Sequence, residues 1–236
     1  MTRRVLLNNV DHADLRVIAR HGPEFGDSVN QVLVLPSEFE AAQREYPIFF
    51  RRDANGELQA VAILGLDRDE NLFLGPGGWN ARYVPAAQQR GPFSIALQDA
   101  DAAPMIHIDL DHPRVSRADG EPLFLPAGGS APYLQHVSRV LGLIYDGLEA
   151  SRPFFQALEA LDLIETVDVE AKLGDGTEYV LPGLFTVSHA RLSALRGADL
   201  ERLHASGALR AAYMVLASMA NMSALIDAKR RRLAGA

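Results

Sequence analysis

The chain has 236 residues, long enough to bury one full hydrophobic core. Its 48% hydrophobic and 22% charged residues are typical of a folded globular protein. A net charge of −7 at pH 7 gives no overall attraction to nucleic acid or anionic lipid, so we expect no nucleic-acid partner. The absence of cysteine excludes disulfides, thiolate metal sites and cysteine catalysis.

Short strands between turn residues are predicted along the first half of the chain. Residues 31–35 form an apolar strand that Pro36 ends, and Ser37 caps a short helix over 38–44. Residues 48–52 and 57–66 form a hairpin, because Asn55-Gly56 is a strong turn signal. Further strands are predicted at 71–74, 93–97 and 105–110.

Helices dominate after Pro126. The glycines of residues 128–132 predict a flexible joint, and apolar residues at helical spacing predict a helix over 133–150. Pro153 then begins a second helix, over 154–163. Alternating apolar residues predict a β-hairpin over 165–187, followed by helices at 190–195, at 199–204 and from Ala208.

These elements predict an α+β fold, with a mostly antiparallel sheet in the N-terminal half and C-terminal helices packed on it. We expect a single domain over 1–236, with a strand-rich part (1–126) and a helix-rich part (133–236). The inserted hairpin (165–187) either extends the main sheet or forms a small lobe of its own, and we favour the lobe.

Neither end of the chain predicts membrane insertion. The apolar run at residues 5–7 is shorter than the roughly seven to fifteen residues that a signal peptide needs. Arg210 and Asn221 interrupt the apolar segment 208–226, so a buried terminal helix is favoured over a tail anchor. The basic residues 229–232 suit the negative end of that helix. We therefore expect no membrane span and a cytoplasmic location.

The most informative stretch, residues 45–97, crowds aromatic residues beside glycine and proline. Because glycine and proline restrict or redirect the backbone, the pattern specifies one precise local structure. It contains no phosphate loop, no metal-ligand set and no nucleophile–base pair. The motifs in order are Tyr46-Pro47-Ile48, Asn71-Leu72-Phe73, Gly77-Gly78-Trp79, Tyr83-Val84-Pro85-Ala86 and Gly91-Pro92-Phe93.

This ordered series resembles the SapC family of bacterial proteins, and the resemblance runs from about residue 33 to residue 225. The family commonly carries Arg-Arg-Tyr-Pro-Phe where this chain has Gln89-Arg90-Gly91-Pro92-Phe93. The resemblance gives no catalytic residues and no cofactor to carry over to this chain, and the family takes its name from a surface-layer locus. Later motifs continue it: Pro113-Arg114-Val115-Ser116, Gly120-Glu121-Pro122, Pro132-Tyr133-Leu134-Gln135 and Leu184-Phe185.

The aromatic stretch also predicts a binding surface. Trp79 and Tyr83 lie one helical turn apart, so their rings share one side if the segment is helical. Arg82 offers a guanidinium to a carboxylate or carbonyl of a bound chain. We expect these residues at the rim of a groove that Asn71 and Phe73 help to shape. The alternative interpretation makes Trp79 and Tyr83 buried residues that cover one end of the sheet.

A second hypothesis concerns a metal. His107-Ile108-Asp109 on a strand, completed by the distant His189, has the outline of an iron-binding facial triad. That site would serve an Fe(II)- and 2-oxo-acid-dependent oxygenase. Otherwise we expect neither metal nor cofactor.

The favoured function is that of a non-enzymatic accessory or binding protein that recognises a peptide or protein partner. The oxygenase is the first alternative. A surface-layer or export-associated component, suggested by the family name, is the second.

Overall fold

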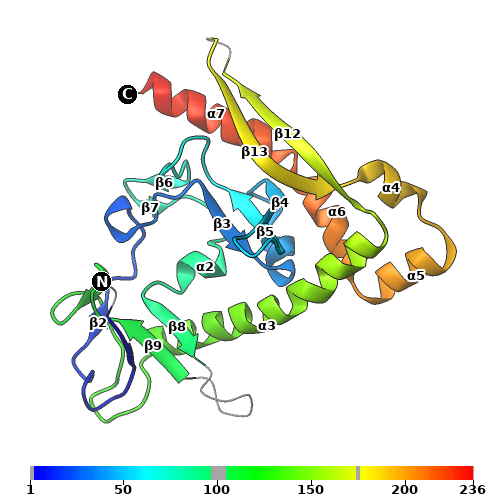
Figure 1. The fold of residues 1–236 in the computed structure, drawn as a ribbon. Coiled ribbons are helices and arrows are strands. Elements are labelled where there is room, and N and C mark those ends of the chain that lie inside the picture. Colours follow the sequence, from blue (N-terminus) through cyan, green and yellow to red (C-terminus); the bar gives the residue numbers. More distant parts are fainter. Residues whose placement is uncertain (1–2, 97–104, 174–175, 236) are drawn as a thin grey trace.

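The computed structural model describes residues 3–96, 105–173 and 176–235 (Figure 1). About 37% of the chain is helical and 26% is in strands, with antiparallel sheets in the N-terminal half and helices toward the C-terminus. The predicted α+β class is confirmed. The end of the predicted strand 93–97, at Leu97, lies outside the described residues, as do Gly174 and Asp175 of the predicted hairpin turn.

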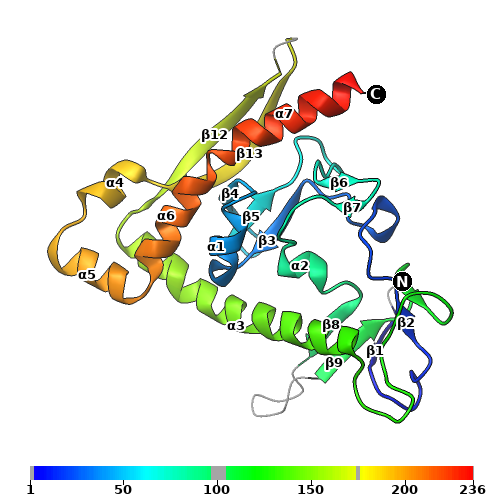
Figure 2. The same ribbon diagram turned by 180° about the vertical axis from the view of Figure 1, so that it is seen from behind.

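A five-stranded antiparallel sheet forms the centre of the molecule (Figures 1 and 2). The predicted 53–56 turn joins two of its strands, and the Asp53 carboxylate accepts the Asn55 and Glu57 backbone N–H groups at 2.8 and 2.9 Å. The strand order is β12 (Ile164–Lys172), β13 (Glu178–Val187), β4 (Ile48–Arg52), β5 (Leu58–Ile63) and β3 (Gln31–Val34).

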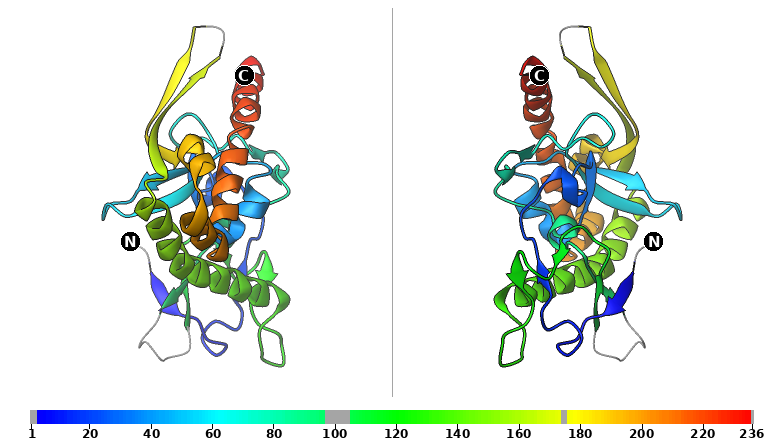
Figure 3. Two further views of the ribbon diagram at one scale, coloured as in Figure 1. Left: turned by 90° about the vertical axis from the view of Figure 1, so that its right-hand side faces the viewer. Right: turned by 90° about the vertical axis from the view of Figure 1, so that its left-hand side faces the viewer.

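The β12–β13 hairpin joins this sheet, so the separate lobe that we favoured is wrong. Its base pairs with β4 through Phe185 and Phe50. Ala171 and Leu184 are buried against Phe49 of the sheet and Leu225 of the C-terminal helix, because the hairpin alone cannot cover its apolar side. The outer part of the hairpin projects beside α7 (Figure 3).

Alternation along the strands sends side chains to both faces of the sheet. Ile48 and Phe50 pack in one apolar cluster and Phe49 in another. The predicted terminal helix is broken at 219–220 into α6 (Ala208–Ser218), which packs on the first cluster, and α7 (Asn221–Ala234), which packs on the second. By length and composition 208–234 is apolar enough to cross a membrane, a test that core helices of soluble proteins also pass.

The basic end of α7 is anchored to the molecule. Lys229 is 3% exposed, and its ammonium contacts Asp67 at 2.5 Å and Glu70 at 2.7 Å. The Arg232 guanidinium donates to the backbone carbonyls of Asn71 and Leu74, at 3.1 and 2.8 Å. These side chains therefore hold the aromatic stretch, a role beyond the predicted interaction with the helix dipole.

A second, smaller core packs two three-stranded sheets on the start of α3. Its buried residues include Val17, Phe93, Ile108, Leu123 and Val137. One sheet contains β1 (Arg4–Leu6), β9 (Met105–Asp109) and β8 (Phe93–Ala96); the other contains β10 (Val115–Ser116), β2 (Arg16–Val17) and β11 (Glu121–Pro122).

One 29-residue helix, α3 (Pro132–Ala160), replaces the two helices predicted around Pro153. Its first half buries Val137 in the small core and its second half buries Phe154 in the main core, and this packing offsets the cost of an internal proline. The predicted flexible joint before it is wrong. Ala131 is fully buried, and its N–H donates to the Leu123 carbonyl at 2.9 Å.

The remaining elements are short. They are the 3-10 turns Pro23–Phe25 and Pro36–Glu38, α1 (Phe39–Ala42), the paired β6 (Leu74–Gly75) and β7 (Gly78–Trp79), α2 (Ala86–Gln89), α4 (His189–Ala194) and α5 (Gly197–Ala205). The helix predicted at 38–44 is thus largely confirmed by α1. Of the strand predicted at 71–74, only Leu74 lies in a strand, at the start of β6.

Candidate functional site

A hollow of about 430 Å³ lies where the two cores meet, which is a common position for ligand sites. Its walls come from the segment after β2, the 82–91 segment that contains α2, the turn before β10 and the start of α3. The polar residues lining it are His21, Arg82, Tyr83, Gln88, Gln89, Arg114, Tyr133 and His136, and none of the described lining residues is acidic. We call this space the junction hollow.

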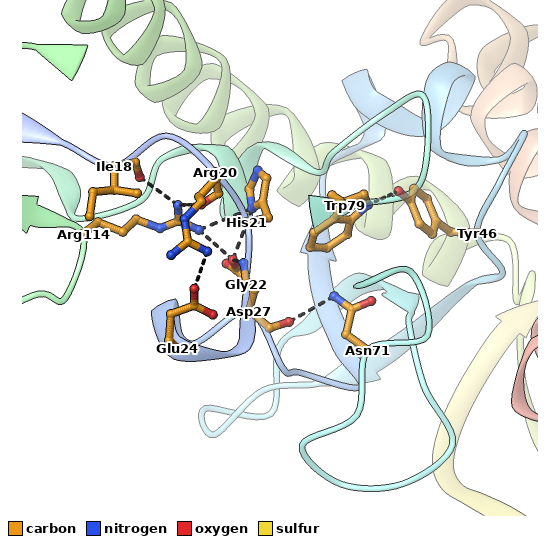
Figure 4. Close-up of polar contacts among 10 residues, drawn as sticks. All are labelled: Ile18, Arg20, His21, Gly22, Glu24, Asp27, Tyr46, Asn71, Trp79 and Arg114. Carbon is orange, nitrogen blue, oxygen red and sulfur yellow. Dashed lines mark hydrogen bonds and ion pairs between the residues drawn. The ribbon is translucent and has the colours of Figure 1, made fainter. Parts of the chain in front are cut away.

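One wall of the junction hollow is organised by Asp27, which is 2% exposed (Figure 4). A single carboxylate oxygen accepts the Gly22 N–H at 2.8 Å and the Arg114 guanidinium at 2.6 Å, and lies 3.3 Å from His21 Nδ1. Burial alone would raise the pKa of Asp27, but the hydrogen bonds from His21 and Gly22 and the charge of Arg114 outweigh it and lower that pKa. The carboxylate is therefore ionised and neutralises Arg114.

Arg114 is fixed as firmly as its partner. It is 3% exposed, and its Nη1 donates to the Ile18 carbonyl at 3.0 Å and to the Arg20 carbonyl (Figure 4). Its guanidinium also lies over the Phe25 ring, 4.7 Å from the centroid. This geometry joins the small core to the 18–27 segment and fixes Arg114 in the lining of the hollow.

From His21 a line of contacts leads to the main sheet. The His21 ring meets Trp79 edge-on, with centroids 5.4 Å apart, and Trp79 Nε1 donates to the Tyr46 hydroxyl at 2.9 Å (Figure 4). The Tyr46 hydroxyl in turn donates to the Tyr83 carbonyl. Trp79 thus lies behind the hollow, half-buried, and supports both of its walls.

Glu38 fixes the opposite wall. It is 3% exposed, and it accepts the Tyr83 hydroxyl at 2.5 Å, the Ala86 N–H at 2.8 Å and the Leu35 N–H at 3.0 Å. Burial raises the pKa of Tyr83, and the hydrogen bond to Glu38 raises it further. The Tyr83 hydroxyl is therefore held as a donor to Glu38, and Tyr83 is fixed in the lining of the junction hollow.

The structure separates the five predicted binding residues into three positions. Arg82 and Tyr83 line the hollow, whereas Trp79 and Phe73 support it from behind, with the Phe73 ring 4.7 Å from that of Tyr46. Asn71 is buried, and its amide donates to the Asp27 carbonyl at 3.0 Å. The helical geometry assumed for 79–83 is not present, because Trp79 ends the short strand β7 and α2 begins only at Ala86.

Several residues that line or support the junction hollow were not predicted from the sequence. Arg114 and Tyr133 stand in motifs that carry the family resemblance, so their presence there was a usable signal. His21 and Asp27 lie on a loop without a recognisable motif. Their proximity to Arg114, more than eighty residues away in the chain, follows only from the tertiary fold.

A larger hollow of about 730 Å³ lies between the 53–56 turn and α3. In its lining, Arg52 lies 3.8 Å from Glu159 and donates to the Gly56 carbonyl at 2.7 Å. Because Arg52 is paired in this way, its guanidinium is less available to a ligand. The junction hollow is the stronger candidate.

The residues of the iron hypothesis lie apart. His107 and Asp109 lie on β9, whereas His189 begins α4 at the opposite end of the molecule (Figure 1). The Asp109 carboxylate accepts the Arg3 and Asp111 N–H groups at 3.0 and 3.2 Å. Within 3–96, 105–173 and 176–235, no group of three or more His, Asp or Glu residues is placed to hold a metal ion.

Fold and hollow together define an α+β protein with a polar, donor-rich recess between two cores. Comparison with protein families identifies the family of this chain. The SapC family model matches residues 7–225, nearly the whole chain. The chain belongs to the SapC family, as the aromatic and proline-glycine motifs predicted. Neither the curated proteins nor the solved structures contain a significant match.

Proposed function

We propose that this SapC-family chain is a non-enzymatic binding protein that recognises a peptide or protein partner at the junction hollow. The observation that carries the proposal is the lining itself. Arg82 and Tyr133 bring donor side chains to a recess of about 430 Å³, a size typical of ligand sites, and Arg114 lies beside them. A peptide supplies carbonyl and carboxylate acceptors that match them.

The rigidity of the walls supports this function. Asp27 and Glu38 hold opposite sides through buried, charge-assisted hydrogen bonds, and Trp79 connects the two sides. A preorganised site loses less conformational entropy on binding than a mobile one. The walls are therefore built to hold donors in fixed positions.

The tyrosines around the hollow carry protonated hydroxyls. Burial raises the pKa of Tyr46, of Tyr83 and of Tyr133. Their hydroxyls consequently stay protonated at neutral pH, as hydrogen-bond donors and poor nucleophiles. The Tyr46 and Tyr83 hydroxyls already donate within the protein, to the Tyr83 carbonyl and to Glu38, so the Tyr133 hydroxyl is the one that suits recognition of an acceptor group.

The chain contains its own reporter for a test. Trp79 is the only tryptophan, and its ring contacts His21, which lines the hollow. Titration with a pool of random-sequence peptides should change the Trp79 fluorescence saturably, and a display selection from the same pool should yield individual binders. Their affinity should fall about tenfold in Arg82→Ala, as expected when a charged hydrogen bond is lost.

Arg139→Ala is the matched control. Arg139 is an exposed arginine on α3, close in sequence to His136 but absent from the lining, and its removal should leave the affinity unchanged. Selected peptides that bind Arg82→Ala and the parent protein equally well would refute a partner site at the junction hollow.

A further inference from the structure

The charges around the junction hollow indicate which group of the partner enters it, an inference that rests on the function proposed above. Arg114 is neutralised by Asp27 at 2.6 Å. The Arg82 side chain is exposed, and within the described parts of the chain it has no carboxylate partner; only its backbone N–H bonds to Glu45. The lining therefore has one uncompensated permanent positive charge, to which His21 and His136 add only when protonated.

The floor of the hollow offers a further donor. An ideal Cβ built at Gly91 would lie 3.6 Å from Arg114 Cδ and 4.0 Å from the Tyr133 hydroxyl oxygen, which places these groups together under the glycine. Gly91 has a φ of +52°, in the left-handed region that favours glycine. The Tyr133 hydroxyl has no hydrogen-bond partner in residues 3–96, 105–173 or 176–235 and is free to donate to a ligand.

We propose that the junction hollow binds one carboxylate of the partner peptide, held between the Arg82 guanidinium and the Tyr133 hydroxyl beside Arg114. A carboxylate accepts two or more such donors at once, and its single negative charge matches the single unpaired cation. A phosphate group, with a charge of about −1.5 to −2 at pH 7, would bury an excess of negative charge near Asp27. Both the C-terminus of a chain and an acidic side chain provide the required group.

The test uses the tightest peptide recovered from the random pool, synthesised in matched forms. One form keeps every carboxylate, a second carries a C-terminal amide, and a third replaces each Asp and Glu by Asn and Gln. Affinities are read from the Trp79 fluorescence of the full chain. One of the two changes should weaken binding about tenfold, the loss expected for a charged hydrogen bond. Which one does so identifies the C-terminus or a side chain as the source.

Protein variants locate the effect. Tyr133→Phe removes only the hydroxyl. It should reduce the preference for the free-acid peptide over the neutral form that binds less tightly, and Arg82→Ala should abolish that preference. Tyr145→Phe is the matched control, a tyrosine of α3 outside the lining, and it should retain the full preference. Circular dichroism and the melting temperature confirm that each variant is folded.

The outcomes separate this inference from the proposed function. If both neutral forms bind as tightly as the free acid while Arg82→Ala still weakens all three, the carboxylate assignment is wrong and the binding function stands. If Arg82→Ala changes none of the affinities, both fail. A further form of the peptide carries a phosphate monoester in place of the carboxylate whose removal weakened binding. Tighter binding of this form than of the free acid would also overturn the assignment of a single negative charge to the site.

Discussion

Glu38 should be among the most sensitive positions for the stability of this protein. Its buried carboxylate accepts three hydrogen bonds, from the Tyr83 hydroxyl and the N–H groups of Leu35 and Ala86. Glu38→Gln preserves the shape but replaces one acceptor oxygen with an NH₂ group. Each oxygen of the Glu38 carboxylate accepts one backbone N–H, Oε1 that of Ala86 and Oε2 that of Leu35. In either orientation of the glutamine amide, its NH₂ group therefore faces a backbone N–H.

The cost follows from these contacts. A buried N–H without an acceptor costs about 1–3 kcal/mol, and the remaining hydrogen bonds lose the contribution of the charge, about 1 kcal/mol in total. We expect Glu38→Gln to lower the free energy of unfolding by about 3 kcal/mol, which is a melting-temperature decrease of about 6–12 °C for a chain of this size.

Urea unfolding at neutral pH measures this loss. Glu45→Gln is the control, because among the described residues Glu45 accepts only the Arg82 N–H, at an exposed position. This change should alter stability by less than about 0.5 kcal/mol. Tyr83→Phe should cost about 1 kcal/mol less in the Glu38→Gln background than in the parent, since the two groups share one hydrogen bond. A loss below about 1 kcal/mol for Glu38→Gln would refute the reasoning.

Three further predictions concern the scaffold. Gly147→Ala should destabilise the protein by about 1–3 kcal/mol, because the new Cβ would lie 2.6 Å from Leu35 Cδ1. Gly142→Ala has open space around it and should instead stabilise α3 by about 0.5–1 kcal/mol. Thermal unfolding of both variants measures this difference. Lys229→Met should cost about 3 kcal/mol in urea unfolding, because it leaves the largely buried Glu70 carboxylate without its ion pair. The lowered pKa of Asp27 contributes stability that is present above its unfolded value of about 3.9 and is lost as the pH falls through the folded value. The decline in unfolding free energy below about pH 4 should therefore be shallower in Asp27→Asn than in the parent.

Local signals in the sequence predicted much of the fold. The Asn55-Gly56 turn and the alternation over 48–63 identify their hairpin because turn chemistry and strand period act over a few residues. The helix break predicted at Pro153 is wrong, because both ends of α3 pack against residues far away in the chain and this packing offsets the local cost of the proline. The attachment of the β12–β13 hairpin likewise depends on Phe50, which no local pattern connects to Phe185.

The candidate site was predicted only in part for the same reason. Arg82 and Tyr83 were found because aromatic and basic residues stand beside glycine and proline in one short stretch. Arg114 and Asp27 form their ion pair across 87 residues, and neither has a motif that names its partner. The support that Trp79 provides from behind the hollow depends on Tyr46, another contact made only in the folded chain.

The most direct measurement of the central claim is the affinity of one selected peptide for the parent protein, Arg82→Ala and Arg139→Ala, read from Trp79 fluorescence under identical conditions. We predict an affinity about tenfold weaker for Arg82→Ala and an unchanged affinity for Arg139→Ala. Equal affinities for all three proteins, or an equal loss in the two variants, would contradict a partner site at the junction hollow.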